Sequence, residues 1–187
     1  MKPDNRSTSY ALRRRDVVRR ILHDRGDVLV IAGLGSTAWD VTAAGDHDLN
    51  FPLWGAMGGA MAMGLGLALA QPDRRVLVIT GDGETLMGIG SFATISAQQP
   101  RNLSVCTFDN ERYGETGMQT THTAAATDLA GKASASGFAG AATVRNEDQL
   151  TAALPVFLEA HGPVDHVIMV RAEKLDFVLP PRVGVHL

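Results

Sequence analysis

The stretch VLVITGDGETLM, residues 76–87, decides the fold. Its first five residues are uncharged and mostly β-branched, which is typical of a strand buried on both faces of a parallel sheet. Glycines at positions 81 and 83 then mark a tight turn, and a helical pattern follows. Similar strand patterns occur at Val28–Ala32, Leu103–Asp109 and His166–Ala172. The repeated unit is a buried strand that leads through a turn into a helix.

Helical patterns alternate with these strands. They cover Ser36–Ala44, Met57–Ala70, Leu86–Gln99, Thr127–Ser136 and Glu147–Ala160, and Asn146 is a candidate N-cap for the last of them. This alternation predicts an α/β fold, a doubly wound parallel sheet with helices on both faces. No linker or internal repeat interrupts the pattern, so we expect residues 1–187 to form a single domain.

The N-terminal region is rich in arginine. Apolar residues at helical spacing within Ser9–His23 predict an amphipathic helix whose basic face is solvated. The Arg-rich start has no apolar core of the kind found in a signal peptide, so we expect no targeting segment. The whole chain has 17 Lys and Arg against 20 Asp and Glu, which argues against a nucleic-acid partner.

The single cysteine, Cys106, narrows the possible chemistry. One thiol excludes a disulfide framework, a cysteine-based zinc site and an iron–sulfur cluster held within the chain. We therefore expect a cytoplasmic protein. The uncharged run Phe51–Ala70 is long enough to span a bilayer, but its many Gly and Ala residues favour a helix packed closely against neighbouring backbone.

Ligands of doubly wound sheets bind where strands end and helices begin. After the first strand, residues 33–38 (GLGSTA) fit the dinucleotide fingerprint, but no later strand ends in the acidic residue that would bind a ribose. This argues against a nicotinamide cofactor. A phosphate contact by Gly35, Ser36 and Thr37 remains open.

A second pair of turns predicts a cation site. Asp82 follows one predicted strand and Asn110 follows the next, with 26 residues between Gly83 and Asn110, about the length of one βα crossover. The two side chains should therefore lie in adjacent loops. Carboxylate and amide oxygens suit a hard cation that also binds diphosphate oxygens. The alternative is that both are unrelated turn residues.

These motifs carry a resemblance. The GDG turn, the following Asn110, the flanking strands and the upstream run Leu53–Gly58 (LWGAMG) resemble the diphosphate-binding domain of thiamine diphosphate enzymes. The resemblance implies Mg²⁺ held by Asp82, Asn110 and the backbone oxygen of Arg112. It also implies that the Gly55 carbonyl accepts from the cofactor's amino group and that Met57 bends the cofactor into a V shape. With the possible phosphate contacts at Gly35, Ser36 and Thr37, the predicted cofactor-binding set is Gly35, Ser36, Thr37, Gly55, Ala56, Met57, Gly81, Asp82, Gly83, Glu84, Asn110, Arg112, Tyr113 and Gly114.

The polar segment after Asn110 has the composition of a mobile loop over a site. His122 and Gln119 are candidate substrate contacts in it, and Glu115 is a candidate acid or base. Some related single-chain decarboxylases use a Glu about six residues past the second metal ligand. Here Thr116 stands six residues past Asn110, with Glu115 beside it, so the sequence departs from that pattern.

In this family the cofactor binds between two domains, and the second domain supplies a glutamate that activates the pyrimidine. Nothing in this chain resembles that second domain, so we expect a hetero-oligomer with a separate pyrimidine-binding subunit. From about Val28 to Ala172 the chain resembles the β subunit of sulfopyruvate decarboxylase and the C-terminal half of phosphonopyruvate decarboxylase. The resemblance implies a lyase that acts on a 2-oxo acid with an anionic tail, for which Arg112 is the nearest cation in sequence.

Two alternatives stay open. The β subunits of 2-oxoacid:ferredoxin oxidoreductases also carry a GDG turn, but they usually bring cluster-ligating cysteines, and this chain has one cysteine. The second alternative is a cofactor-binding module without turnover. Retention of Asp82, Asn110 and Met57 counts against it.

Overall fold

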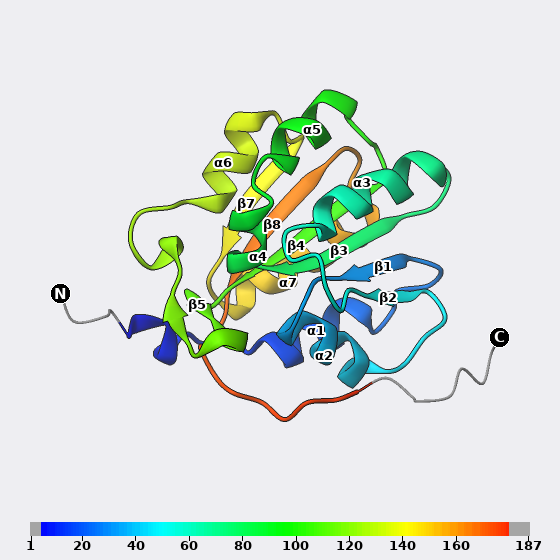
Figure 1. Ribbon diagram of the computed structural model, residues 1–187. Coiled ribbons are helices and arrows are strands. Elements are labelled where there is room, and N and C mark those ends of the chain that lie inside the picture. The colour runs from blue at the N-terminus through cyan, green and yellow to red at the C-terminus, as the bar shows by residue number, and fades with distance from the viewer. Residues whose placement is uncertain (1–4, 180–187) are drawn as a thin grey trace.

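A computed structural model describes residues 5–179 of the chain. Its centre is one six-stranded parallel sheet with the strand order β2-β1-β3-β4-β8-β7 (Figure 1). The strands are β1 (Leu29–Ala32), β2 (Asn50–Pro52), β3 (Val76–Gly81), β4 (Leu103–Asp109), β7 (Gly140–Val144) and β8 (Val164–Met169). The chain reverses its direction across the sheet between β1 and β3, which is where doubly wound sheets bind ligands.

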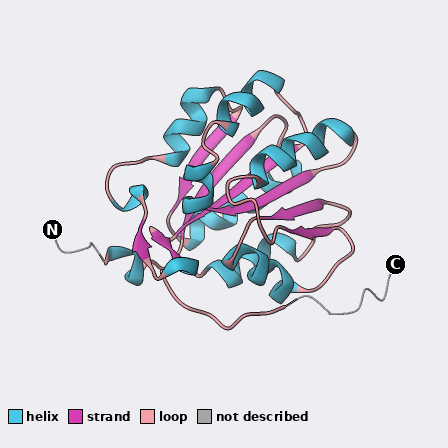
Figure 2. Ribbon diagram, viewed as in Figure 1, coloured by secondary structure: helices cyan, strands magenta, loops and turns pink. Residues whose placement is uncertain are grey.

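Helices cover both faces of this sheet (Figure 2). On one face lie α1 (Arg14–Leu22), α2 (Ser36–Ala44) and α7 (Glu147–Glu159), and on the other α3 (Ala60–Ala70), α5 (Ser91–Gln98) and α6 (Leu129–Ser136). Successive residues of β3 alternate between the two apolar cores: Leu77 and Ile79 join the first, Val76 and Val78 the second. The predicted doubly wound α/β fold is confirmed.

Several predicted boundaries hold. β4 has the predicted bounds, α2 spans the predicted residues, and the Asn146 side chain accepts a hydrogen bond from the Gln149 amide as the N-cap of α7. The helix predicted over Thr127–Ser136 begins two residues later, because Asp128 caps it by accepting from the Gly131 amide. The last strand is shifted to Val164–Met169 rather than His166–Ala172.

The predicted helix over Leu86–Gln99 is confirmed only in part, because it is interrupted and its first turn begins earlier. Two helices replace it, α4 (Asp82–Met87) and α5, with a break at residues 88–90. A Cβ at Gly88 would lie 2.0 Å from the carbonyl oxygen of Gly58. The turn therefore packs so closely against the loop before α3 that only glycine fits at this position. The helix predicted from Met57 also begins later, at Ala60, because Ala56 and Gly58 adopt left-handed conformations.

The predicted N-terminal helix is shorter than Ser9–His23. Residues Arg6–Ser9 form a 3₁₀ turn, called η1, and Leu12 pairs with Val170 beyond the end of β8, so α1 begins only at Arg14. The sequence also missed β2 and β7, which are short and contain Pro or small residues. Within residues 5–179 no helix has both the length and the apolar character required to cross a bilayer.

Candidate functional site

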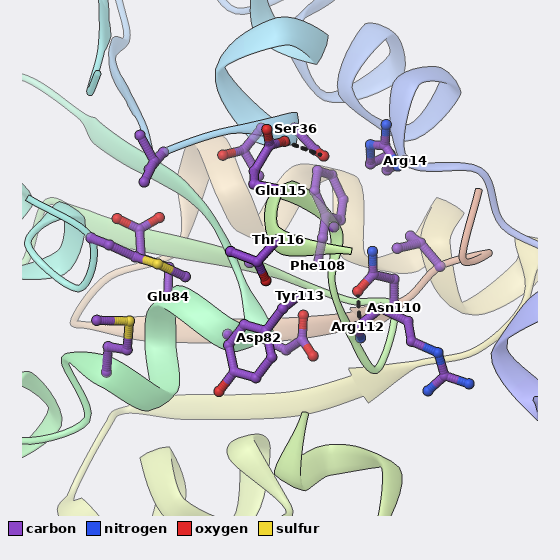
Figure 3. Close-up of a pocket in the computed structure, with 18 residues that line it drawn as sticks. Arg14, Ser36, Asp82, Glu84, Phe108, Asn110, Arg112, Tyr113, Glu115 and Thr116 are labelled. Carbon is purple, nitrogen blue, oxygen red and sulfur yellow. Dashed lines mark hydrogen bonds between the residues drawn. The ribbon is translucent and has the colours of Figure 1, made fainter. Parts of the chain in front are cut away.

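A pocket of about 300 Å³ opens at the carboxyl edge of the sheet, outside the ends of β1, β3 and β4 (Figure 3). It therefore lies at the reversal point of the strand order. Its walls come from the turn after β1, the start of α4, the loop after β4 and the start of α1. The lining residues are Arg14, Leu34, Ser36, Thr37, Met57, Gly81, Asp82, Gly83, Glu84, Met87, Phe108, Asn110, Arg112, Tyr113, Gly114, Glu115, Thr116 and Val170.

Asp82 lies at the base of this pocket and is buried. Its Oδ2 accepts hydrogen bonds from Thr121 Oγ1 at 2.5 Å and Thr123 Oγ1 at 3.3 Å, and Thr123 Oγ1 also lies 2.8 Å from Asp109 Oδ1. Burial, together with the neighbouring Asp109 carboxyl, raises the pKa of Asp82. Two carboxyl groups thus share a threonine-lined site from which water is largely excluded.

Asn110 and Arg112 line the pocket on either side of Glu111. The Arg112 backbone amide donates to Asn110 Oδ1 at 2.9 Å, which fixes the amide side chain. The Arg112 guanidinium donates to the Glu111 carbonyl at 2.9 Å and to Asn5 Oδ1 at 3.2 Å. Those bonds hold the guanidinium at the back of the loop, so only the backbone oxygen of Arg112 would be available to a cation.

The donors at this edge fit a hard divalent cation. Within the described residues, no three His, Cys, Asp or Glu side chains form a metal-binding group. A cation here would depend on the Asp82 carboxylate, the Asn110 amide oxygen, a backbone carbonyl and oxygens of a bound ligand. Such all-oxygen sets, completed by substrate phosphates, are typical of Mg²⁺. A cation would also compensate the charge of the buried Asp82 and Asp109 pair.

The glycines of the turn are needed for close packing. A Cβ at Gly83 would lie 2.5 Å from the Tyr113 ring, so the ring lies directly against the backbone that opens α4. A Cβ at Gly33 would lie 1.7 Å from Glu84 Oε2. Glu84 is a buried residue of the pocket wall, where Thr80 Oγ1 donates to Oε2 at 2.9 Å. Burial raises its pKa, and the backbone amides of Gly58, Leu34 and Ala60 partly offset that rise.

Glu115 occupies the N-terminal end of α2. Ser36 Oγ lies 3.4 Å from Glu115 Oε1, and a Cβ at Gly35 would meet the Glu115 side chain. The Thr37 hydroxyl donates to the Gly33 carbonyl at 2.7 Å and so holds the turn after β1. A carboxylate at a helix N-terminus takes the place that a phosphate can take. The site for an anion predicted at Gly35–Thr37 is therefore faced by a side chain of the chain itself.

The remaining predicted residues separate into two groups. Met57 lines the pocket rim and is 37% exposed, whereas Gly55 and Ala56 lie exposed in the same loop but outside the pocket lining. His122 lies in a different hollow, beside Leu86 and Lys132. The segment predicted to be a mobile loop folds as a hairpin, in which β5 (Arg112–Tyr113) pairs with β6 (Gln119–Thr120).

Gln119 bonds within that hairpin rather than toward the pocket. Its side-chain amide donates to the Thr116 carbonyl at 2.9 Å, and its Oε1 accepts from the Thr116 hydroxyl at 3.0 Å. The structure thus brings Glu115 and Thr116 into the pocket and keeps Gln119 and His122 outside its lining.

Arg14 is a pocket residue that the sequence analysis missed. It is buried, and its Nε lies 2.5 Å from Asp40 Oδ2, while Arg15 bonds the other carboxylate oxygen. In Figure 3 Arg14 lies at one end of the pocket and Glu84 at the other. Burial raises the pKa of Asp40, and the two arginines oppose that rise. The Leu12–Val170 pairing that places Arg14 here leaves no local sequence signal.

Asp109, Thr121 and Thr123 were also missed, although two signals pointed to them. Asp109 directly precedes Asn110 at the end of a predicted strand, and Thr121 and Thr123 have the alternating spacing of one extended face. These hydroxyls reach Asp82 because the β5–β6 hairpin brings the chain back toward it, and that pairing is visible only in the structure.

Oxygen donors and a glycine at the start of a helix meet where the strand order of this parallel sheet reverses. This arrangement is typical of α/β proteins that bind cofactors. Comparison with known families makes this specific: residues 36–165 match the family described as "Thiamine pyrophosphate enzyme, C-terminal TPP binding domain". The chain belongs to this family, as its resemblance predicted.

The chain is similar in sequence to two decarboxylases and in fold to one solved structure. The chain is 38% identical over 118 residues to the sulfopyruvate decarboxylase subunit beta of Methanocaldococcus jannaschii, covering 63% of this chain and 62% of that one. It is 36% identical over 157 residues to phosphonopyruvate decarboxylase of Streptomyces viridochromogenes, covering 84% of this chain and 39% of the relative. The chain thus spans less than two thirds of either relative. Benzoylformate decarboxylase from Polynucleobacter necessarius shares the fold, with a TM-score of 0.74 at 20% identity over 95% of this chain and 36% of that chain.

Proposed function

We propose that this chain is the diphosphate- and Mg²⁺-binding subunit of a thiamine diphosphate-dependent 2-oxo acid decarboxylase. The observation that carries the proposal is the meeting of Asp82, Gly83 and Asn110 in one pocket at the reversal point of a sheet whose family binds thiamine diphosphate. The names of the two relatives, both decarboxylases, support the reaction type.

The chain's residues would bind and orient the cofactor. Asp82, Asn110 and the Arg112 carbonyl would hold Mg²⁺, and the amides of Gly83 and Glu84 would face the diphosphate. Met57, at the rim, would pack beneath the bent cofactor without competing for protons. When bound, thiamine diphosphate supplies the electron sink for loss of CO₂ from the 2-oxo acid.

A separate subunit would complete the site. Met57 and Met87 line the pocket and are exposed as well, so its rim is open on this side. Further apolar side chains are exposed in β2, in the loop after it and in α3: Phe51 (55%), Trp54 (50%), Met63 (39%) and Leu69 (50%). Apolar surface next to an open pocket fits a stable protein interface. The partner would supply the glutamate that activates the pyrimidine.

The substrate would be a 3-substituted pyruvate with an anionic tail, such as sulfopyruvate or phosphonopyruvate. The relatives' names support this class. Arg14 would be the cation nearest an anionic group at this wall: its guanidinium is paired with Asp40 and the Glu173 carbonyl, and its remaining N–H groups would face the pocket. The buried, single Cys106 counts against the ferredoxin oxidoreductase alternative and is consistent with a cytoplasmic protein.

The test begins with a tagged chain purified from its native cells. We expect a second, short chain to copurify, and CO₂ release from sulfopyruvate or phosphonopyruvate to require both chains and to exceed release from pyruvate. An active homo-oligomer would contradict the separate partner. Substrate oxidation that requires a ferredoxin-like acceptor would replace the decarboxylase by an oxidoreductase.

A further inference from the structure

The segment Asn5–Leu12 crosses the edge of the sheet next to the loop that carries Asn110. Its backbone is fixed to the chain beyond β8: the Ser7 carbonyl accepts from the Ala172 amide at 2.9 Å, and the Leu12 carbonyl accepts from the Arg171 amide at 2.8 Å. The segment is therefore held in place by contacts of its own, independent of the loop it lies against.

Glu111, between Asn110 and Arg112, has an unusual backbone for its residue type. Its φ is +60°, in the left-handed region, which disfavours any residue with a Cβ and which glycine adopts freely. Its side chain is fully buried, so its left-handed backbone lies in a packed part of the protein and not in an exposed turn. Surrounding contacts must offset the strain of this conformation.

Two side chains of the N-terminal segment supply those contacts. Glu111 Oε1 accepts a hydrogen bond from Arg6 Nε at 2.7 Å and another from the Tyr10 hydroxyl at 2.7 Å. Burial and the Glu111 carboxylate raise the pKa of Tyr10 to about 12, so its phenol keeps the proton it donates.

Arg6 also contacts Thr123, whose hydroxyl bonds the buried carboxyls Asp82 and Asp109. One of its terminal nitrogens lies 2.6 Å from Glu111 Oε1 and donates to the Thr123 carbonyl at 3.3 Å. Thr123 in turn bonds Asp109 through its hydroxyl at 2.8 Å, and the Glu111 carbonyl accepts from the Thr121 amide at 3.0 Å. A single guanidinium thus joins the loop of Asn110 to the hairpin return that bonds the buried carboxyls.

We propose that Arg6, Tyr10 and Glu111 form a clamp of positioning residues that holds the Asn110–Arg112 loop in its cation-binding conformation. The inference rests on the proposed function, because it assigns the clamp a role in Mg²⁺-dependent cofactor binding. None of the three residues lines the main pocket, so the clamp acts through its neighbours. A glycine at position 111 needs no clamp to remain left-handed, and this gives the proposal a direct test.

The experiment compares Arg6→Met and Tyr10→Phe in two backgrounds, the native chain and Glu111→Gly. The readout is the Mg²⁺ concentration for half-maximal binding of thiamine diphosphate by the chain with its copurified partner. Hydrogen exchange of the backbone amides of residues 110–113 is measured in parallel on the protein without cofactor. Arg13→Met is the matched control, because Arg13 is a neighbouring arginine paired with Glu173 at 2.7 Å, away from the loop.

We expect Arg6→Met to raise the required Mg²⁺ concentration about tenfold, Tyr10→Phe less, and both to speed exchange at 110–113. In the Glu111→Gly background Arg6→Met should change the Mg²⁺ requirement by less than about twofold. Equal effects in both backgrounds, or none in either while the native protein binds normally, would overturn the clamp alone. Absence of Mg²⁺-dependent binding in the native protein would overturn the proposed function and the clamp with it.

Discussion

Two buried aspartates show how differently the same side chain can be used. Asp82 lies at the carboxyl edge of the sheet, where Thr121 donates to it and it lines the pocket. Asp165 lies within β8, fully buried, where Thr107 Oγ1 donates to its Oδ1 at 3.0 Å and its Oδ2 has no hydrogen-bond partner among residues 5–179. Burial raises the pKa of both, that of Asp165 to about 7.

The difference between them is one of position and neighbours. Asp82 lies near the Asp109 carboxyl and lines the same pocket as the Asn110 amide, where a ligand can enter. Asp165 lies within a central strand that is paired with β4. A buried carboxyl with a raised pKa is therefore not by itself a sign of function. Its place at the edge where strands end is what makes Asp82 a candidate ligand.

The largest effect should come from Asp82→Ala. Loss of the carboxylate should weaken Mg²⁺-dependent binding of thiamine diphosphate at least about 100-fold, because the cation loses its only charged ligand from the Asp82–Asn110 set. Calorimetric titration measures it. Asp165→Asn is the control and should bind normally; equal losses in both variants would remove the distinction between the two aspartates.

Asp165→Asn should instead change stability, in a pH-dependent manner. The folded-state pKa of Asp165 is about 7, above its unfolded value, so the native protein loses stability as pH rises from about 4 to 7. At pH 8 the variant should be more stable than the native chain by about 4 kcal/mol, and at pH 4 the two should be similar. Denaturant melts at both pH values test this, and a difference that is independent of pH would show that Asp165 does not titrate in this window.

The position of Glu84, another buried carboxyl, depends on a glycine. Gly33→Ala places a methyl group against Glu84 Oε2 and should cost about 1–2 kcal/mol, which thermal melts can measure. Gly66→Ala is the matched control, because nothing lies within 4 Å of its Cβ, and it should be neutral or slightly stabilising. Adding Glu84→Ala to Gly33→Ala should recover part of the loss; a fully additive pair would contradict the proposed contact.

The smallest stability effect is expected at the rim. Met57→Ala and Met63→Ala remove side chains that are similarly exposed, so each should change the free energy of unfolding by no more than about 0.5 kcal/mol. Only Met57 lines the pocket, so only Met57→Ala should lower decarboxylation by the two-chain complex, by about tenfold. Equal activity of the two variants would argue against a role for Met57 beneath the cofactor.

The sequence predicted those parts of the molecule that follow from local pattern. The β-branched runs identified β3 and β4, and parallel topology then predicted that Asp82 and Asn110 would meet in one pocket, as they do. The break at Gly88 was not predictable, since it results from contact with Gly58, about thirty residues earlier. Arg14 reaches the pocket through the Leu12–Val170 pairing, and Thr121 reaches Asp82 through the β5–β6 hairpin; both are non-local contacts.

The central claim is that this pocket binds thiamine diphosphate through a divalent cation. The most direct measurement titrates the chain, together with its copurified partner, with thiamine diphosphate in Mg²⁺ and again after removal of the metal with EDTA. We predict saturable binding that requires Mg²⁺, is restored when the metal is returned, and is much weaker for thiamine monophosphate. Binding that is equal with and without the metal, or absent under both conditions, would contradict the claim.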